Sequence, residues 1–220
     1  MENKAKLEII IDNIFKQKNI TNQKIKDAVL RIPRELFSEN SNLDQLYSHS
    51  IVKYHGAWEI ADIEFVIDIL TNINLENAKS VLVVGSGTGY LLSILSYLVE
   101  EVYGVEIDKN LNEKCMDNIE NLNIVNAISK VGDGLNGWSN EARFSSIIVC
   151  CSCDQTPRPL IEQLDENGEL IIPIGSLNLW PDQHQELIKI VKNRTELIQT
   201  KISNVFVNPI ILKTEKVISE

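Results

Sequence analysis

The sequence lacks any apolar run that approaches the roughly 20 residues of a membrane-spanning helix. Its first residues mix charged and apolar side chains, so the apolar block of a signal peptide is absent as well. Cysteine is scarce: there are four, and they form no spread-out disulfide framework. These absences favour the reduced cytoplasm, and we expect cytoplasmic localisation with no membrane partner.

Positive charge is also in short supply, since 21 Lys and Arg face 31 Asp and Glu, which gives a formal net charge of −10. A chain this acidic has no general electrostatic footprint for a phosphate backbone, so we expect no nucleic-acid partner. The 220 residues, 44% hydrophobic and 24% charged, have the composition of an ordinary globular protein. No internal repeat or low-complexity tract interrupts them.

Residues 1–75 are predicted to form a helical cap with a substrate and cofactor loop, ahead of a core over residues 76–220. Thr21 is expected to cap a helix that ends before Pro33, and Asp62 to precede a further helix. Between them, residues 37–61 are predicted to be irregular, and loops of this length are often functional.

From residue 80 onward, short strands alternate with helices. The predicted strands are 80–85, 102–106, 127–132, 145–150 and 169–175, and the predicted helices are 90–100 and 108–122. Such alternation is typical of a doubly wound, mostly parallel α/β sheet of the Rossmann-like class. Apolar runs after residue 185 predict a closing antiparallel hairpin.

The sharpest local signal is the glycine-rich segment from Gly85 to Tyr90, GSGTGY, between an apolar strand and an apolar helix. Glycines allow a sharp turn and a close approach of ligand to backbone, although a plain strand–helix turn can use them too. Glu106 ends the next strand, 21 residues after Gly85, and Asp133 follows the strand after that. In a parallel sheet all three reach one edge, where such sheets bind ligands.

Two observations indicate which ligand the glycine-rich segment binds. A dinucleotide fingerprint would need glycine at position 90, where Tyr90 stands, so no diphosphate is expected there. A glycine turn with Glu106 for the ribose and Asp133 for the adenine amino group favours S-adenosylmethionine, with S-adenosylhomocysteine as the product.

From about residue 20 to residue 210 the chain resembles the protein-L-isoaspartate O-methyltransferases, class I S-adenosylmethionine-dependent methyltransferases. The resemblance rests on PRELF (33–37), VLVVGSGTGY (81–90), GDGLNGW (132–138), IIPIG (171–175) and VFVNP (205–209), in the family's order. It implies the same fold and a peptide or protein substrate. The predicted cofactor contacts are Ile60, Gly85, Ser86, Gly87, Gly89, Tyr90, Glu106, Ile107, Asp133 and Gly134.

The chain departs from the family at the segment before the helix that follows Asp62. Counting back from Gly85 places Ala61 where the family has the serine usually regarded as active, and Glu59 where it has a threonine. A negative Glu59 would repel an incoming carboxylate unless it is paired or turned away. No catalytic residue is therefore assigned; the candidate pocket residues are Trp58, Glu59, Ile60, Cys151 and Ser152.

Three of the cysteines, Cys150, Cys151 and Cys153, lie within four residues, but no second cluster has metal-ligand spacing. We expect no metal site, and we interpret these residues as small apolar side chains at a strand end.

We interpret the chain as a carboxyl O-methyltransferase. Loss of the serine favours a specialised peptide, for example the C-terminal or an aspartyl carboxylate of a ribosomally made, modified peptide. Three alternatives remain: repair of isoaspartyl proteins, O- or N-methylation of a small molecule, and a cofactor-binding protein without turnover.

Overall fold

The computed structural model describes residues 2–38, 46, 52–54, 58–76, 78–139, 142–175, 185–194, 196–208 and 210. Within these ranges the side chains of residues 2–4, 6–7, 52–54 and 58–60 are not described.

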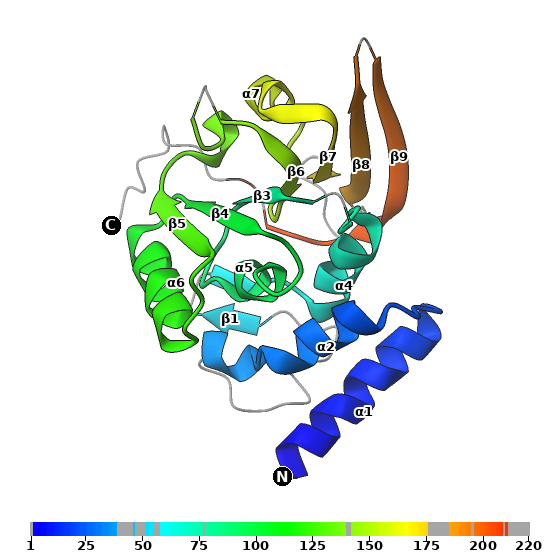
Figure 1. Cartoon of the computed structure of the whole chain (residues 1–220), viewed down its shortest axis with the longest axis vertical. Helices are drawn as coiled ribbons and strands as arrows, with labels where there is room; N and C mark the ends of the chain where they lie inside the picture. Colours follow the sequence, from blue (N-terminus) through cyan, green and yellow to red (C-terminus); the bar gives the residue numbers. More distant parts are fainter. Residues whose placement is uncertain are drawn as a thin grey trace, which may run out of the picture.

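A seven-stranded sheet forms the centre of the protein (Figure 1). Its strand order is β5-β4-β3-β6-β7-β8-β9; the first five pair in parallel, and β8 and β9 add an antiparallel hairpin. The strands are β3 (Ser80–Val84), β4 (Glu101–Glu106), β5 (Ala127–Val131), β6 (Phe144–Val149), β7 (Leu164–Ile174), β8 (Gln185–Asn193) and β9 (Glu196–Val205). The predicted doubly wound α/β class is confirmed.

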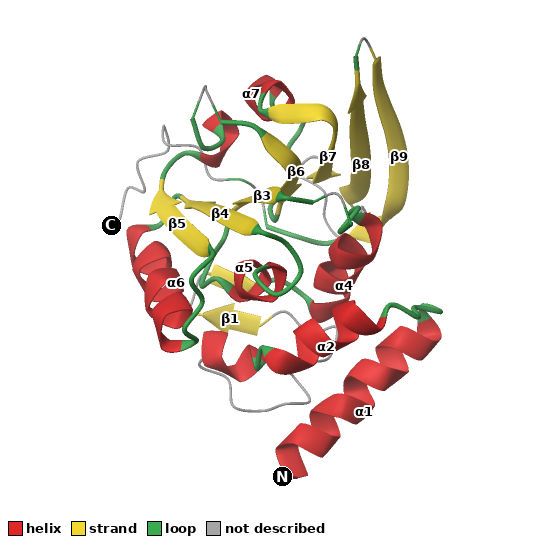
Figure 2. Ribbon diagram, in the orientation of Figure 1, coloured by secondary structure: helices red, strands yellow, loops and turns green. Residues whose placement is uncertain are grey.

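Helices cover the two faces of the sheet unequally (Figure 2). The apolar layer on one face includes residues of α1 (Glu2–Gln17), α2 (Gln23–Arg31), α4 (Ile63–Asn72), α5 (Tyr90–Leu95) and α6 (Lys109–Asn121), and α1 packs against α2. The other face packs against α7 (Arg158–Glu162) and the loop around the 3-10 turn η2 (Gly134–Asn136). In the described part of the chain, no helix is long and apolar enough to cross a membrane.

The apolar residues of each strand alternate between these two layers because successive side chains of a strand point to opposite faces. Val81 and Val83 join the layer of α4 and α5, whereas Leu82 and Val84 join the layer of α7. All four are buried on β3, which therefore reads as a continuous apolar run, as expected for a central parallel strand.

The amino-terminal part of the chain differs from its prediction in two places. Asn22, not Thr21, caps α2, because its side chain accepts from the backbone N–H of Ile25. The segment 37–61 was expected to be irregular, but it contains β1 (Val52–Tyr54) and β2 (Trp58–Ile60), which pair antiparallel. Asp62 caps α4 as predicted, with hydrogen bonds from Glu64 and Phe65.

Two elements of the core also differ in length from their predictions. The helix expected over 90–100 ends at Leu95, because residues 96–100 continue as turns. The strand expected over 169–175 begins earlier, at Leu164, and its pairing with β6 shifts register between Phe144 and Ser146.

A half-buried ion pair adds to the pairing of β7 and β8 in joining the β8–β9 hairpin to the rest of the protein. Lys189 Nζ lies 2.7 Å from Glu169 on β7 and also donates to the carbonyl of Asn72 at 2.7 Å. Glu169 in turn accepts from the backbone N–H of Asn74 at the end of α4. We expect Lys189→Met to lower the free energy of unfolding by about 3 kcal/mol, because it leaves the Glu169 carboxylate without its cation.

The matched control is Lys201→Met on the same hairpin. Lys201 pairs with Glu186 at the same 2.7 Å distance, but both side chains are about half exposed. Solvent screens such a pair, so its loss should cost at most about 1 kcal/mol. Urea unfolding gives the free energy of unfolding of each variant. Equal losses in the two variants would contradict a larger contribution from the ion pair of Lys189 and Glu169.

Candidate functional site at the carboxyl edge of the sheet

The loops that carry the predicted site residues leave the same edge of the sheet, and backbone hydrogen bonds hold them next to one another. Gly85 donates to the carbonyl of Val105 at 2.8 Å, and Gly132 donates to the carbonyl of Glu106 at 2.8 Å. On the other side, Cys150 donates to the carbonyl of Val84 at 2.9 Å. The structure therefore brings together the glycine loop, the end of β4, the start of η2 and the end of β6.

The glycine loop has one open position. Among the residues that the structure describes, a Cβ added at Gly87 would meet no atom within 4 Å, although its φ of +54° favours glycine. At Gly89 a Cβ would lie 2.7 Å from the Sγ of Cys115, and at Gly134 it would lie 2.3 Å from Val84. Gly87 thus leaves room for a ligand, whereas Gly89 and Gly134 leave room for protein side chains.

Glu106 lies directly beside this open position. Its carboxylate accepts the backbone N–H of Gly87 at 2.8 Å and that of Asp108 at 3.0 Å. Burial raises the pKa of Glu106, and the backbone donors from Asp108 and Gly87 oppose that shift. A carboxylate has about four lone-pair positions, so Glu106 can accept further hydrogen bonds from ligand hydroxyls.

Asp133 lies after the end of β5 and is the N-cap residue of η2. One oxygen of its carboxylate caps the turn by accepting from the backbone N–H of Leu135 at 3.0 Å. Its second oxygen has no hydrogen bond to any residue that the structure describes. Asp133 can therefore accept from a ligand amino group while it holds the turn in place, and half-buried Ile107 lies after β4 on the same edge.

Tyr90 faces the protein rather than the open side of the loop. Its ring is 3% exposed and packs edge-on against Phe37 of the 3-10 turn η1 (Arg34–Phe37), with the guanidinium of Arg34 over its face. Burial raises the pKa of Tyr90 to about 12. Thr88 donates to the carbonyl of Phe37 at 3.2 Å. PRELF is thus the segment that packs against the glycine loop from the amino-terminal side.

Ala61 is tied to the same turn through its backbone. The fully buried Arg34 donates a hydrogen bond to the Ala61 carbonyl, just before α4 begins. Ala61 itself is half-buried and packs against the main apolar layer. The side chains of Trp58, Glu59 and Ile60 lie outside the described residues, so their predicted places in the pocket remain predictions.

The cysteines after β6 lie against the glycine loop. A Cβ at Gly85 would be 3.6 Å from the Sγ of Cys151 and 3.7 Å from the Cβ of Cys150. Burial raises the pKa of Cys150 to about 12 and that of Cys151 well above its usual value. These groups are therefore neutral thiols with little nucleophilic character at neutral pH. The described residues contain no group of three or more His, Cys, Asp or Glu that could hold a metal ion.

Ser152 is more deeply placed than its neighbours. Its side chain is fully buried, and its hydroxyl has no hydrogen-bond partner within the described ranges. Its backbone N–H donates to Asn208 at 2.8 Å, and its carbonyl accepts from Ile210. In this conformation the Ser152 side chain is closed off from any ligand, whereas Cys151 is partly accessible.

Sequence reasoning missed the polar residues that support the loop from α6 and β5. Asn118 donates to the carbonyl of Thr88 at 2.9 Å, and Asn112 and Ser129 connect to Ser86 by hydrogen bonds. The detectable signal is the spacing of Asn112, Cys115 and Asn118, which places three small or polar residues on one helix face. That face is the buried one.

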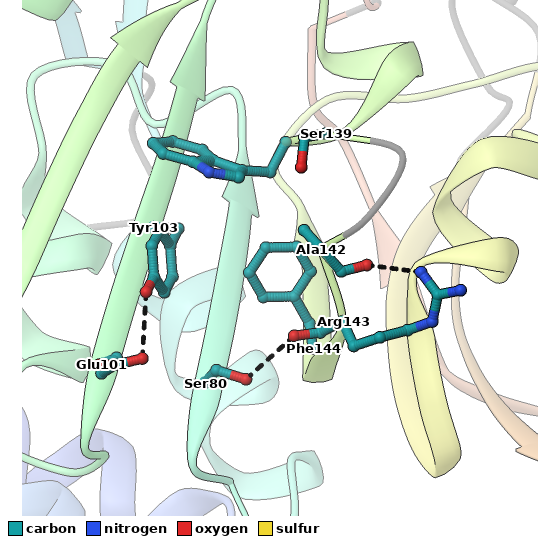
Figure 3. Close-up of a pocket in the computed structure, with 8 residues that line it drawn as sticks. Ser80, Glu101, Tyr103, Ser139, Ala142, Arg143 and Phe144 are labelled. Carbon is teal, nitrogen blue, oxygen red and sulfur yellow. Dashed lines mark hydrogen bonds between the residues drawn. The ribbon is translucent and has the colours of Figure 1, made fainter.

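A surface hollow of about 370 Å³ lies elsewhere, at the amino-terminal ends of the parallel strands (Figure 3). Its walls include the rings of Tyr103, Trp138 and Phe144, which pack edge-to-face, and Tyr103 donates to Glu101 at 3.0 Å. Ser80, Glu101 and Phe144 are the first residues of β3, β4 and β6. The hollow is therefore at the opposite edge from the glycine loop.

Curated relatives resemble the chain over most of its length. It is 32% identical to the protein-L-isoaspartate O-methyltransferase of Vibrio atlanticus over 195 residues, which cover 89% of this chain and 91% of that protein. It is also 32% identical to the enzyme of that name from Photobacterium profundum over 199 residues, covering 90% and 92%.

Solved structures share the fold. A protein-L-isoaspartate O-methyltransferase structure is 26% identical with a TM-score of 0.78, and the match covers 94% of this chain and 65% of that chain. A Plasmodium falciparum structure described as the same enzyme, in complex with S-adenosyl-L-homocysteine, is 22% identical with a TM-score of 0.76, covering 93% and 97%.

The family model described as protein-L-isoaspartate(D-aspartate) O-methyltransferase matches residues 4–215. The resemblance noted in the sequence is thereby confirmed, and with it S-adenosylmethionine as the cofactor and methyl transfer as the chemistry. The chain belongs to the protein-L-isoaspartate O-methyltransferase family of S-adenosylmethionine-dependent enzymes.

Proposed function

We propose that this protein transfers a methyl group to a carboxylate of a protein or peptide, and that an isoaspartyl residue is its first candidate acceptor. The observation that carries the proposal is the open Gly87 hydrogen-bonded to Glu106, within a chain that matches this family from residue 4 to residue 215. Curated relatives of similar length support the same activity.

The cofactor would lie over the glycine loop. We propose that Gly85, Ser86 and Gly87 line its amino-acid end with backbone, that Glu106 accepts from ribose hydroxyls, and that Asp133 accepts from the adenine amino group. The residues fit this ligand because Gly87 leaves space, and because both carboxylates keep lone pairs that internal hydrogen bonds do not use.

When bound, S-adenosylmethionine would supply an electrophilic methyl carbon: a carboxylate oxygen would bond to this carbon as its bond to sulfur breaks, giving a methyl ester and S-adenosylhomocysteine. A carboxylate is already ionised at neutral pH, so the protein needs no general base. The task of its residues is to align the acceptor and to exclude water. Neutral thiols at Cys150 and Cys151, whose pKa values are raised, suit such a site because they do not compete as nucleophiles.

A second candidate function rests on Ala61. This position offers an acceptor carboxylate a methyl group and no hydroxyl, and its backbone is held by Arg34. A pocket without that hydroxyl favours a dedicated peptide whose other residues supply the binding energy. The carboxylate of such a peptide would be C-terminal or aspartyl.

The space at Gly87 can be tested with two glycine substitutions. We expect Gly87→Ala to lower the free energy of unfolding by only about 1 kcal/mol, from its positive φ, yet to abolish the rise in melting temperature that S-adenosylmethionine produces. Gly134→Ala should instead cost about 3 kcal/mol of stability through its overlap with Val84. A Gly87→Ala protein with the wild-type thermal shift would contradict the proposed cofactor position.

The two carboxylates can be tested by calorimetry with S-adenosylmethionine. We expect Glu106→Ala and Asp133→Ala each to weaken binding by about 1–3 kcal/mol, because a ligand hydrogen bond is lost. The control is Glu113→Ala, which removes an exposed carboxylate of α6 that pairs only with Lys109 among the described residues. Unchanged affinity in both site variants would refute the assignment.

The acceptor can be identified by transfer of labelled methyl to four matched peptides. One sequence carries aspartate or isoaspartate, each with a free or an amidated C-terminus. We expect label to require isoaspartate, and Ala61→Ser to raise kcat/KM for that peptide by restoring a hydroxyl. Label that depends on the free C-terminus, or no label despite cofactor binding, would support the dedicated peptide instead.

A further inference from the structure

A chain of three buried polar side chains runs beneath the glycine loop. The Ser86 hydroxyl of the loop lies 3.0 Å from the Ser129 hydroxyl of β5. Ser129 then donates to Oδ1 of Asn112 on α6 at 2.8 Å. The exposed fractions of Ser86, Ser129 and Asn112 are 7%, 6% and 8%, so none of the three is solvated in its place.

The direction of these hydrogen bonds follows from the number of protons available. A serine hydroxyl has one proton, and Ser129 gives its proton to Asn112. The proton between the two serines must therefore come from Ser86, which donates to Ser129. This arrangement directs the Ser86 side chain toward Ser129, into the protein, and leaves the backbone of the loop on the proposed ligand side.

Fixing Ser86 also fixes the next peptide group. The N–H of Gly87 donates to Glu106 at 2.8 Å, and the N–H of Ser86 lies 3.3 Å from the carbonyl of Val105. A rotation of the loop at Ser86 would break both bonds. The buried chain thus influences two parts of the proposed cofactor site at once, the open Gly87 and the carboxylate of Glu106.

The surrounding residues leave space for these three hydrogen-bonded side chains, and burying them costs desolvation free energy. A Cβ at Gly104 would lie 2.7 Å from the Ser129 hydroxyl, so the glycine leaves that hydroxyl its space. Burying hydroxyl and amide groups carries a desolvation penalty that apolar side chains would avoid. The hydrogen bonds offset this penalty only when every member of the chain is present.

We infer that Asn112 and Ser129 are positioning residues, which act through Ser86 to hold the glycine loop in its cofactor-binding conformation before the cofactor arrives. The inference rests on the proposed function of the loop. Neither residue touches the cofactor. Their contribution is to preorganise the loop, so their loss should weaken cofactor binding and leave the methyl-transfer step itself unaffected.

The test compares Asn112→Ala and Ser129→Ala with the wild-type protein. Calorimetry gives Kd for S-adenosylmethionine, and methyl transfer to the accepted peptide gives KM and kcat. We expect Kd and the KM for S-adenosylmethionine to rise about tenfold in each variant, with kcat at saturating cofactor within twofold of wild type. The double variant should resemble either single variant, because both act through the same hydroxyl.

Asn126→Ala is the matched control for lost stability. Asn126 donates to the carbonyls of Ser96, Val99 and Glu100 at the far end of β5, so its loss should lower the melting temperature without changing Kd. Wild-type Kd in both Asn112→Ala and Ser129→Ala would overturn the inference. An increase in Kd in Asn126→Ala that matches its loss of stability would overturn it too. A wild-type protein that does not bind S-adenosylmethionine would instead refute the proposed function.

Discussion

The pairing of β3 with a parallel strand on each side is the constraint on which the site depends. The chain proceeds from β3 to β4 and β5 in one direction across the sheet, and then returns to place β6 on the other side of β3. The loops after β3 and β6 therefore leave the carboxyl edge of the sheet on either side of this reversal, which is where open α/β sheets bind ligands. Glu106 ends β4, and the other three site residues follow β3, β5 and β6, so strand order alone brings them together: Gly85, Asp133 and Cys150.

Two sets of contacts hold the glycine loop at this edge of the sheet. From the amino-terminal side, η1 contributes the ring of Phe37 and the guanidinium of Arg34 against Tyr90. From the side of α6, Asn118 binds the carbonyl of Thr88. The loop is thus held by one element that precedes it in the sequence and by one that follows it. The amino-terminal helices and the sheet also share one apolar layer.

At position 61 the contact with Arg34 involves the backbone and not the side chain. Arg34 holds the carbonyl of Ala61, which places the start of α4 whatever side chain stands there. A change from hydroxyl to methyl at this position therefore leaves this backbone hydrogen bond intact. The contact that places α4 therefore does not depend on which carboxylate the protein methylates.

The alternation of strands and helices was predictable from the sequence, and so was the meeting of Gly85, Glu106 and Asp133. Both are determined by local patterns, because parallel strands must deliver their carboxyl ends to one edge. The sequence could not show that Gly87 is open while Gly89 is filled by Cys115, or that Tyr90 is a core residue. It also missed the β1–β2 pair and the chain from Ser86 to Asn112. These features depend on which distant side chains meet, and only the tertiary structure decides that.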